Sequence, residues 1–232
     1  MKINILYLYG DLMNLYGECG NIKALYNYFT KQGIDTKVIE KSILDDLDFK
    51  DIDIIYMGCG MESSQLLALE HLMKYKTNLK KYIDNDKYII ATGNSFELFG
   101  KKFYNNEDLV DGLGFFEFDN EKIDRVVSEG IFKCSLFDGD IVGFQNHNNI
   151  IKCENYLFEN TKFKGYETKY DGFNYKNFYG TYLLGPILAR NPNFLCYVCD
   201  NIIKSKDSKF KIKKLDFSLE EKAYEEFIKN YY

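Results

Sequence analysis

The chain has 232 residues, a length at which one α/β domain with one core is ordinary, so we expect a single domain over residues 1–232. Its hydrophobic fraction of 46% and charged fraction of 28% are close to globular averages, which excludes a disordered or fibrous chain. The net charge of -5 comes from interspersed positive and negative residues, so no basic surface forms for phosphates and we expect no nucleic-acid partner.

The first half of the chain alternates between strand and helix patterns. Continuous apolar runs predict buried strands, and 3.6-residue apolar periods predict amphipathic helices, the first of which ends at Gly33. Strands are predicted at 2–9, 36–40, 53–57 and 88–92, and helices at 20–33, 63–75 and, as a short segment, 96–102. This alternation predicts a mostly parallel sheet that holds ligands in the loops after residues 9, 57 and 92.

The second half has shorter segments with more alternating patterns, which favour antiparallel or mixed pairing. Strands are predicted around 114–118, 125–128, 141–145 and 178–183, and a helix over the final residues 218–232. No internal repeat or proline-rich linker divides the chain, which agrees with one domain.

The chain shows no membrane or secretion signal. No apolar run approaches the about 20 residues that cross a bilayer, and the start of the chain lacks a signal-peptide pattern, so we expect a cytoplasmic protein without membrane insertion. The six cysteines are dispersed, which suits reduced thiols. Cys196 and Cys199 share one face of a predicted helix, which favours packing over a metal site, and no G-x-G-x-x-G follows the first strand. We therefore expect no metal and no cofactor.

Two glycine-containing turns follow buried strands at the predicted ligand-binding edge. A strand that turns sharply into a helix presents the turn residue above the sheet, with backbone N–H groups directed at it, as in nucleophile elbows. Gly93-Asn94-Ser95 forms one such turn, and Gly58-Cys59-Gly60 forms another, whose N–H groups are suited to an anion or a developing oxyanion. Small residues are also needed simply to make the bend, so a purely structural role stays open.

Six stretches carry a family resemblance. They are LYGDLMNLYGECGNI, MGCGMESSQ, ATGNSFELFGKK, VDGLGFF, IVGFQNH and YGTYLLGPIL. In this order and spacing, from about residue 5 to 191, they resemble the cobyric-acid-synthase-like (CobB/CobQ-like) class I glutamine amidotransferases, among them the glutaminase subunits of lipid II isoglutaminyl synthases. The resemblance implies a flavodoxin-like three-layer domain with a central, mostly parallel mixed sheet.

The resemblance also implies a reaction and a partner. In these enzymes the subunit hydrolyses glutamine, and the ammonia passes to an ATP-dependent, Mur-ligase-like subunit that amidates the glutamate of the peptidoglycan stem peptide. An elbow cysteine attacks the glutamine, and a histidine activates the thiol. The FELFGKK stretch places the elbow cysteine at Gly93, and TYLLGPIL places the histidine at Leu184. Neither glycine nor leucine has a side chain that can take up or deliver a proton. We therefore predict a catalytically degenerate subunit with a binding or regulatory role.

Other parts of the family's site have counterparts here. The resemblance assigns the oxyanion loop to Gly58 and Gly60, and the arginine that grips the substrate α-carboxylate to Arg125. Asn94 and Ser95 follow the elbow and are predicted to contact the ligand as well. Glutamine or another small carboxylate is therefore the expected ligand.

An active enzyme with a substitute catalytic pair is the alternative. Cys59 is the one thiol expected near the pocket, at a helix start that lowers a thiol pKa, and His147 matches a family histidine in a loop near the site. A thiol that fills a turn and a histidine that is hydrogen-bonded within its loop are the structural interpretations. His71, in the middle of a helix, is predicted to be structural. Both the active and the degenerate alternatives stay open at this point.

Overall fold

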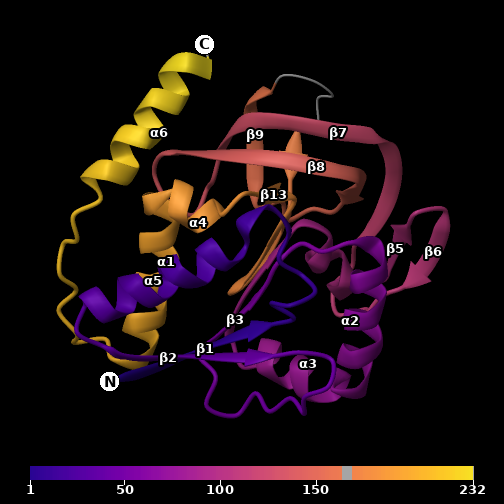
Figure 1. Cartoon of the computed structure of the whole chain (residues 1–232), viewed down its shortest axis with the longest axis horizontal. Coiled ribbons are helices and arrows are strands. Elements are labelled where there is room, and N and C mark those ends of the chain that lie inside the picture. The colour runs from indigo at the N-terminus through magenta and orange to yellow at the C-terminus, as the bar shows by residue number, and fades with distance from the viewer. Residues whose placement is uncertain (164–168, 232) are drawn as a thin grey trace.

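The computed structural model describes residues 1–163 and 169–231 (Figure 1). The strands are β1 (Lys2–Leu8), β2 (Asp35–Lys41), β3 (Ile54–Met57), β4 (Tyr88–Thr92), β5 (Lys102–Asn105), β6 (Asp108–Asp111), β7 (Asp119–Lys133), β8 (Asp140–Lys152), β9 (Phe158–Phe163), β10 (Tyr170–Asp171), β11 (Phe173–Tyr175), β12 (Phe178–Thr181) and β13 (Leu183–Leu184). The helices are α1 (Cys19–Lys31), α2 (Glu62–Lys74), α3 (Lys76–Asp84), α4 (Ile187–Arg190), α5 (Pro192–Lys206) and α6 (Ser218–Tyr231), with the short 3-10 segments η1 (Leu15–Gly17) and η2 (Gly93–Phe99).

The central sheet is mostly parallel. Among the described residues its order is β11-β12-β4-β3-β1-β2, and every neighbouring pair is parallel except β11 with β12. The strands β3 and β4 are buried along their whole length, because helices cover both faces of a parallel sheet. The predicted α/β class and the mostly parallel sheet are therefore confirmed.

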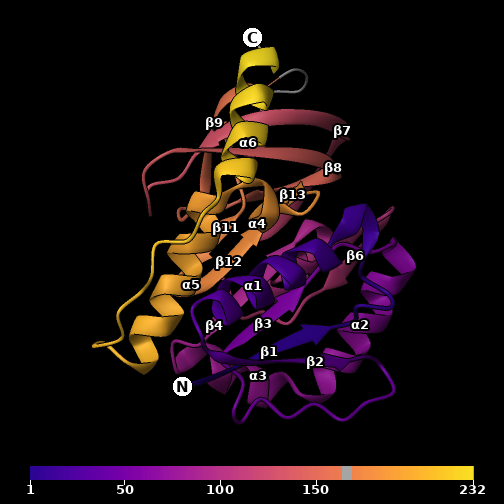
Figure 2. The ribbon, with the colours of Figure 1, turned by 60° about the vertical axis from the view of Figure 1, so that its left-hand side comes forward.

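Two helical layers sandwich this sheet. Alternate side chains of β1 face opposite sides, so that Ile5 packs with α1 and α5 while Leu6 packs with α2 and α3. Figures 1 and 2 show α1 and α5 on one face of the sheet, and α2 and α3 on the other. The three-layer arrangement that the family resemblance implies is present.

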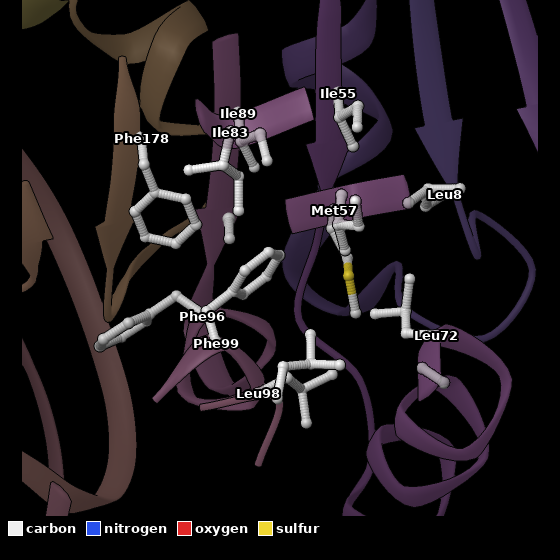
Figure 3. Packing of buried hydrophobic residues seen from close by; sticks show 14 of the residues in the cluster. Leu8, Ile55, Met57, Leu72, Ile83, Ile89, Phe96, Leu98, Phe99 and Phe178 are labelled. Carbon is white, nitrogen blue, oxygen red and sulfur yellow. The ribbon is translucent and has the colours of Figure 1, made fainter. Parts of the chain in front are cut away.

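The core on the α2 side holds the strand ends and η2 together. Figure 3 shows Met57 of β3 and Leu72 of α2 directed toward Leu98 and Phe99 of η2, all of them almost fully buried. Burying a side chain of this size contributes about 1.5–3 kcal/mol. This packing fixes the segment that follows β4, where the site lies.

A second sheet covers one end of the first. Its main feature is the long hairpin of β7 and β8, which pair antiparallel, and β13 joins β8. The segments expected at 125–128 and 141–145 lie within these strands, which are much longer than predicted. The C-terminal α6 packs near α4 and β8, and Tyr232 lies outside the described residues (Figure 2).

Two predicted elements are wrong. Residues 114–118 form no strand, because the backbone N–H groups of Gly114 and Phe115 bond to Gly100 and Phe99 at the end of η2 instead of to a strand. The short helix predicted at 96–102 is the 3-10 segment η2, which ends at Phe99, and residue 102 already begins β5. None of the helices within 1–163 and 169–231 is long and apolar enough to cross a membrane.

Candidate functional site

A polar pocket of about 280 Å³ lies between the carboxyl ends of the central strands and β8. It is lined by Leu15, Tyr16, Cys59, Gly60, Met61, Glu62, Gln65, Asn94, Glu97, Tyr104, Asn106, Arg125, Asn146, His147, Asn148, Asn149 and Tyr182. The loops after β1, β3 and β4 all contribute to its lining, so the pocket lies at the edge of the sheet where ligands were predicted. The pocket thus collects Cys59, Gly60, Asn94, Arg125 and His147 from the predicted site residues.

The turn after β4 has the backbone of an elbow without its side chain. Gly93 has φ +61°, the left-handed conformation that strains every residue with a Cβ atom. A Cβ atom built at Gly93 would lie 2.5 Å from Cβ of Cys59, 2.6 Å from its Sγ and 2.9 Å from Cδ2 of Leu184. The space of a residue-93 side chain is therefore already filled by the other two residues.

Leu184 closes the elbow from the second sheet. It lies in β13, is 1% exposed, and pairs with Phe144 of β8. Its isobutyl group touches the elbow where a base would need to stand, and it can neither accept nor donate a proton. The structure thus brings Gly93, Leu184 and Cys59 into one contact.

The Cys59 thiol is held in its protonated form. The pKa of Cys59 is raised to about 12, chiefly by burial and also by the nearby carboxyl groups of Glu18 and Glu97, against a smaller lowering by the backbone of Asn94. Its Sγ makes a weak hydrogen bond to the Gly60 carbonyl, at 3.9 Å. The thiolate is the reactive form of cysteine, so the thiol is inert at neutral pH. The expected lowering of its pKa by the helix start does not occur, because the burial effect is larger.

His147 lines the same pocket but is fixed as a neutral ring. Its Nδ1 lies 2.7 Å from the Asn149 carbonyl, which only accepts, so Nδ1 carries the proton and Nε2 is a bare acceptor. Burial lowers the pKa of His147 to about 4, and the ring stacks on Tyr182 with centroids 4.2 Å apart. No hydrogen bond joins His147 to Cys59 in the part of the chain that the structure describes.

The residues flanking the elbow are bound within the protein. Asn94 pairs with Gly60 in both directions: its Oδ1 accepts from the Gly60 N–H at 3.1 Å, and its Nδ2 donates to the Gly60 carbonyl at 2.9 Å. The hydroxyl of Ser95 donates toward the carbonyls of Met57 and Thr92, so it anchors the turn and does not line the pocket. Gly58 packs against the loop after β1, where a Cβ atom would lie 2.5 Å from the Met13 carbonyl.

Arg125 stands at the rim of the pocket. It lies at the register irregularity of β7 between Lys122 and Val126, and a bulge of this kind redirects side chains. Its Nε donates to Oδ1 of Asn146 at 2.8 Å, and its side chain is exposed. The guanidinium is thus placed to receive an anionic group of a ligand.

Sequence reasoning missed Glu97, a buried carboxylate that lines the pocket. Its carboxylate accepts from Asn120 and Tyr182 at 2.8 Å each, and from Asn149 and Gln65 at 3.0 and 2.9 Å. Burial raises the pKa of Glu97 to about 7, and the donors from Asn149, Tyr182 and Gln65 lower it. A lone carboxylate inside the apolar FELF stretch was the available signal.

A second missed carboxylate, Glu18, lies behind the elbow. It is fully buried and accepts from the hydroxyl of Thr92 at 2.7 Å and from the Tyr56 hydroxyl. Burial raises its pKa to about 7, while the hydrogen bonds from Tyr56, Thr92 and Asn21 lower it. Glu18 therefore ties the loop after β1 to the last residue of β4.

The described residues contain no cluster of three or more His, Cys, Asp or Glu side chains that would suit a metal ion. His71 hydrogen-bonds through Nδ1 to the Tyr9 hydroxyl at 3.0 Å and is buried. Cys196 and Cys199 are free thiols on α5, with Cys199 inside the core. The polar side chains that line the pocket are amides, carboxylates, tyrosine hydroxyls, one thiol, one arginine and one neutral histidine.

Comparisons with known proteins agree with this architecture. Residues 4–192 match the CobB/CobQ-like glutamine amidotransferase domain. The chain is 32% identical over 228 residues to the Lipid II isoglutaminyl synthase (glutamine-hydrolyzing) subunit GatD of Staphylococcus aureus (strain N315), covering 96% of this chain and 93% of that protein. It is 30% identical over 217 residues to the same subunit of Streptococcus pneumoniae (strain ATCC BAA-255 / R6), covering 88% and 82%.

Solved structures resemble the fold. A glutamine amidotransferase from Thermotoga maritima superposes with a TM-score of 0.51 at 12% identity, covering 98% of this chain and 92% of that one. Another glutamine amidotransferase superposes with a TM-score of 0.56 at 13% identity, covering 84% and 98%. At these identities the likeness extends to the fold alone.

Proposed function

The chain belongs to the CobB/CobQ-like glutamine amidotransferase family, and from that membership we propose that it is a catalytically degenerate member that binds a small ligand and acts through a partner subunit. The filled elbow carries the proposal. Where relatives need a nucleophile, Gly93 has no side chain, and Cys59 and Leu184 occupy the space that one would take. An acyl-enzyme has no atom on which to form at residue 93.

The missing base supports the same conclusion. Nucleophilic catalysis by a thiol needs a group within hydrogen-bond reach that takes up the proton. Leu184 is an alkane at the expected position, and the Nδ1 of His147 is committed to a carbonyl. A thiol whose pKa burial raises to about 12 and a ring whose pKa burial lowers to about 4 do not exchange a proton near neutral pH.

The pocket itself remains suited to an amino acid. Arg125 offers a guanidinium for a carboxylate. Glu62 and Glu97 also line the pocket, and their carboxylates offer acceptors for an ammonium group. Glutamine or another small carboxylate is the ligand that we propose. Binding without turnover would make the pocket a sensor of that ligand.

We propose an ATP-dependent, Mur-ligase-like subunit as the partner, in the cytoplasm. The support comes from the relatives, which are named as subunits of a lipid II isoglutaminyl synthase. Co-expression of this chain with such a ligase, followed by pull-down, tests the pairing. Recovery of a stoichiometric complex supports the proposal, and a chain that elutes alone with the ligase present refutes it.

The catalytic part is tested by incubating the purified chain with L-glutamine and measuring released ammonia. We expect no release above the uncatalysed rate, with or without the ligase. The alternative, a glutaminase that uses Cys59 with His147, is favoured by one observation, namely that both residues line the same pocket. It predicts that a glutamine-analogue electrophile labels Cys59 in the wild type and in a Cys134→Ser control but not in Cys59→Ser, whereas our proposal predicts no labelling of Cys59.

A further inference from the structure

The oxyanion-binding groups of the elbow are already occupied by the protein. An elbow-type oxyanion hole uses two backbone N–H donors, one from the residue after the nucleophile and one from a neighbouring loop. In this chain the residue after the elbow is Asn94, and the neighbouring loop is Gly58-Cys59-Gly60. The two donors are therefore the backbone N–H of Asn94 and a backbone N–H of this loop.

The Gly60 N–H donates to a carboxamide that belongs to the chain. Its acceptor is Oδ1 of Asn94 at 3.1 Å, and Nδ2 of Asn94 donates back to the Gly60 carbonyl at 2.9 Å. Only one orientation of the Asn94 amide satisfies both bonds. A carboxamide oxygen thus lies on the loop's N–H, as the carboxamide of a glutamine would.

The second donor lies beside a group of the protein as well. The backbone of Asn94 lowers the pKa of the Cys59 thiol, against the larger raising effect of burial. Cys59 in turn fills the side-chain space of Gly93. The Cys59 side chain therefore occupies the side-chain space at Gly93, and the Asn94 carboxamide accepts from the N–H of the loop.

The surroundings hold this arrangement in place. Nε2 of Gln65, a residue 1% exposed, donates to the Asn94 carbonyl at 2.7 Å. Gly60 has no room to shift toward the loop after β1, because a Cβ atom there would lie 2.3 Å from Sδ of Met13 and 2.8 Å from the Leu12 carbonyl. The backbone of Asn94 and the position of Gly60, the two partners in this pair, are thus both held by their neighbours.

We propose that Asn94 is a built-in occupant of the oxyanion loop, a specificity-determining residue that keeps the side-chain carboxamide of glutamine off the Gly60 N–H. The inference rests on the proposed ligand-binding function and deepens it. The pocket then holds an amino acid by its charged α-groups at Arg125 and the carboxylates, without selecting for a carboxamide. Such a site distinguishes poorly between glutamine and an amino acid of similar length that has no carboxamide.

Two variants of the full chain test this. Asn94→Gly removes the occupant and frees the Gly60 N–H, whereas Asn94→Asp keeps an acceptor for it. We expect L-glutamine affinity, measured by titration calorimetry, to rise about tenfold in Asn94→Gly, the gain from one net hydrogen bond. The affinity for L-methionine, which has no carboxamide, should not rise in Asn94→Gly, and the affinity for glutamine should not rise in Asn94→Asp, whose carboxylate still accepts from the Gly60 N–H.

A second measurement follows the Gly60 N–H directly. In the wild type the Gly60 amide proton should exchange slowly with solvent by NMR; it should exchange faster in Asn94→Gly and become protected again when L-glutamine is added. A Gly60 amide that is unprotected in the wild type, a glutamine affinity that does not rise in Asn94→Gly, or an equal rise for methionine each overturns the proposal. Ammonia release by the wild type would instead refute the proposed loss of activity, so the two failures are distinguishable.

Discussion

Replacing Gly93 by cysteine returns a thiol to the elbow and tests whether the site is filled. The new Cβ would meet Cys59 at 2.5 to 2.6 Å and Leu184 at 2.9 Å. Overpacking of this kind costs about 1–3 kcal/mol, and a side chain at φ +61° adds about 1–2 kcal/mol of left-handed strain. We therefore expect Gly93→Cys to lower the free energy of unfolding by roughly 2–5 kcal/mol, or the melting temperature by roughly 4–20 °C.

A matched control separates crowding from backbone strain. Gly114 has φ +65°, yet a Cβ atom there would have nothing within 4 Å. Gly114→Cys should therefore lose only the strain of about 1–2 kcal/mol. The difference between the two variants, measured by urea unfolding, reports the crowding at the elbow alone.

The crowding should disappear when Cys59 is reduced in size. Because both Cβ and Sγ of Cys59 contact the added atom, Cys59→Ala should relieve part of the Gly93→Cys penalty and Cys59→Gly more of it. A double-mutant cycle should give a favourable coupling of about 1–3 kcal/mol, as neighbours in contact do. Equal losses for Gly93→Cys and Gly114→Cys, or strictly additive losses with Cys59→Gly, would refute a filled elbow.

Three further outcomes follow from the buried titratable groups. The folded pKa of Glu18, about 7, exceeds its ordinary value of 4.5, so its contribution to stability is present below pH 4.5 and is lost as the pH rises through 7. Glu18→Gln should therefore remove up to about 3 kcal/mol of the fall in unfolding free energy between pH 4.5 and 7, and an unchanged fall would contradict the burial argument. The His147 ring, with a pKa of about 4, should keep its Nδ1 proton in NMR spectra from pH 5.5 to 8, and a titration midpoint near 6.5 would show that it is not buried. Glu97→Gln places an NH2 donor opposite the side chains that donate to Glu97, and should lower the free energy of unfolding by about 1–3 kcal/mol. The exposed control Glu117→Gln should change the free energy of unfolding by less than about 1 kcal/mol.

The parallel core was readable from the sequence because its strands are apolar on both faces. The stretches IIYM and YIIAT are buried throughout, and each is followed by a glycine turn, so pattern and structure agree within one or two residues. The hairpin of β7 and β8 was underestimated because its outer half is polar and rich in asparagine. Its strands are defined by long-range pairing, which a local pattern does not contain.

The site was foreseen in its parts but not in its contacts. The family motifs pointed to Gly93, Leu184 and Cys59, yet nothing in their spacing says that the last two fill the space of the first. The pair of Asn94 with Gly60 is likewise invisible in sequence, because it joins residues 34 positions apart. Glu97 and Glu18 were missed because buried carboxylates that accept several hydrogen bonds look like ordinary surface residues when read one at a time.

The proposed loss of glutaminase activity is tested most directly by measuring ammonia from L-glutamine with the purified chain in complex with the proposed ligase subunit. The complex is the state in which any dormant activity should appear. We predict no release above the uncatalysed rate, and no difference between the wild type and Cys59→Ser. Saturable release of ammonia by the wild-type complex that Cys59→Ser abolishes would contradict the proposal.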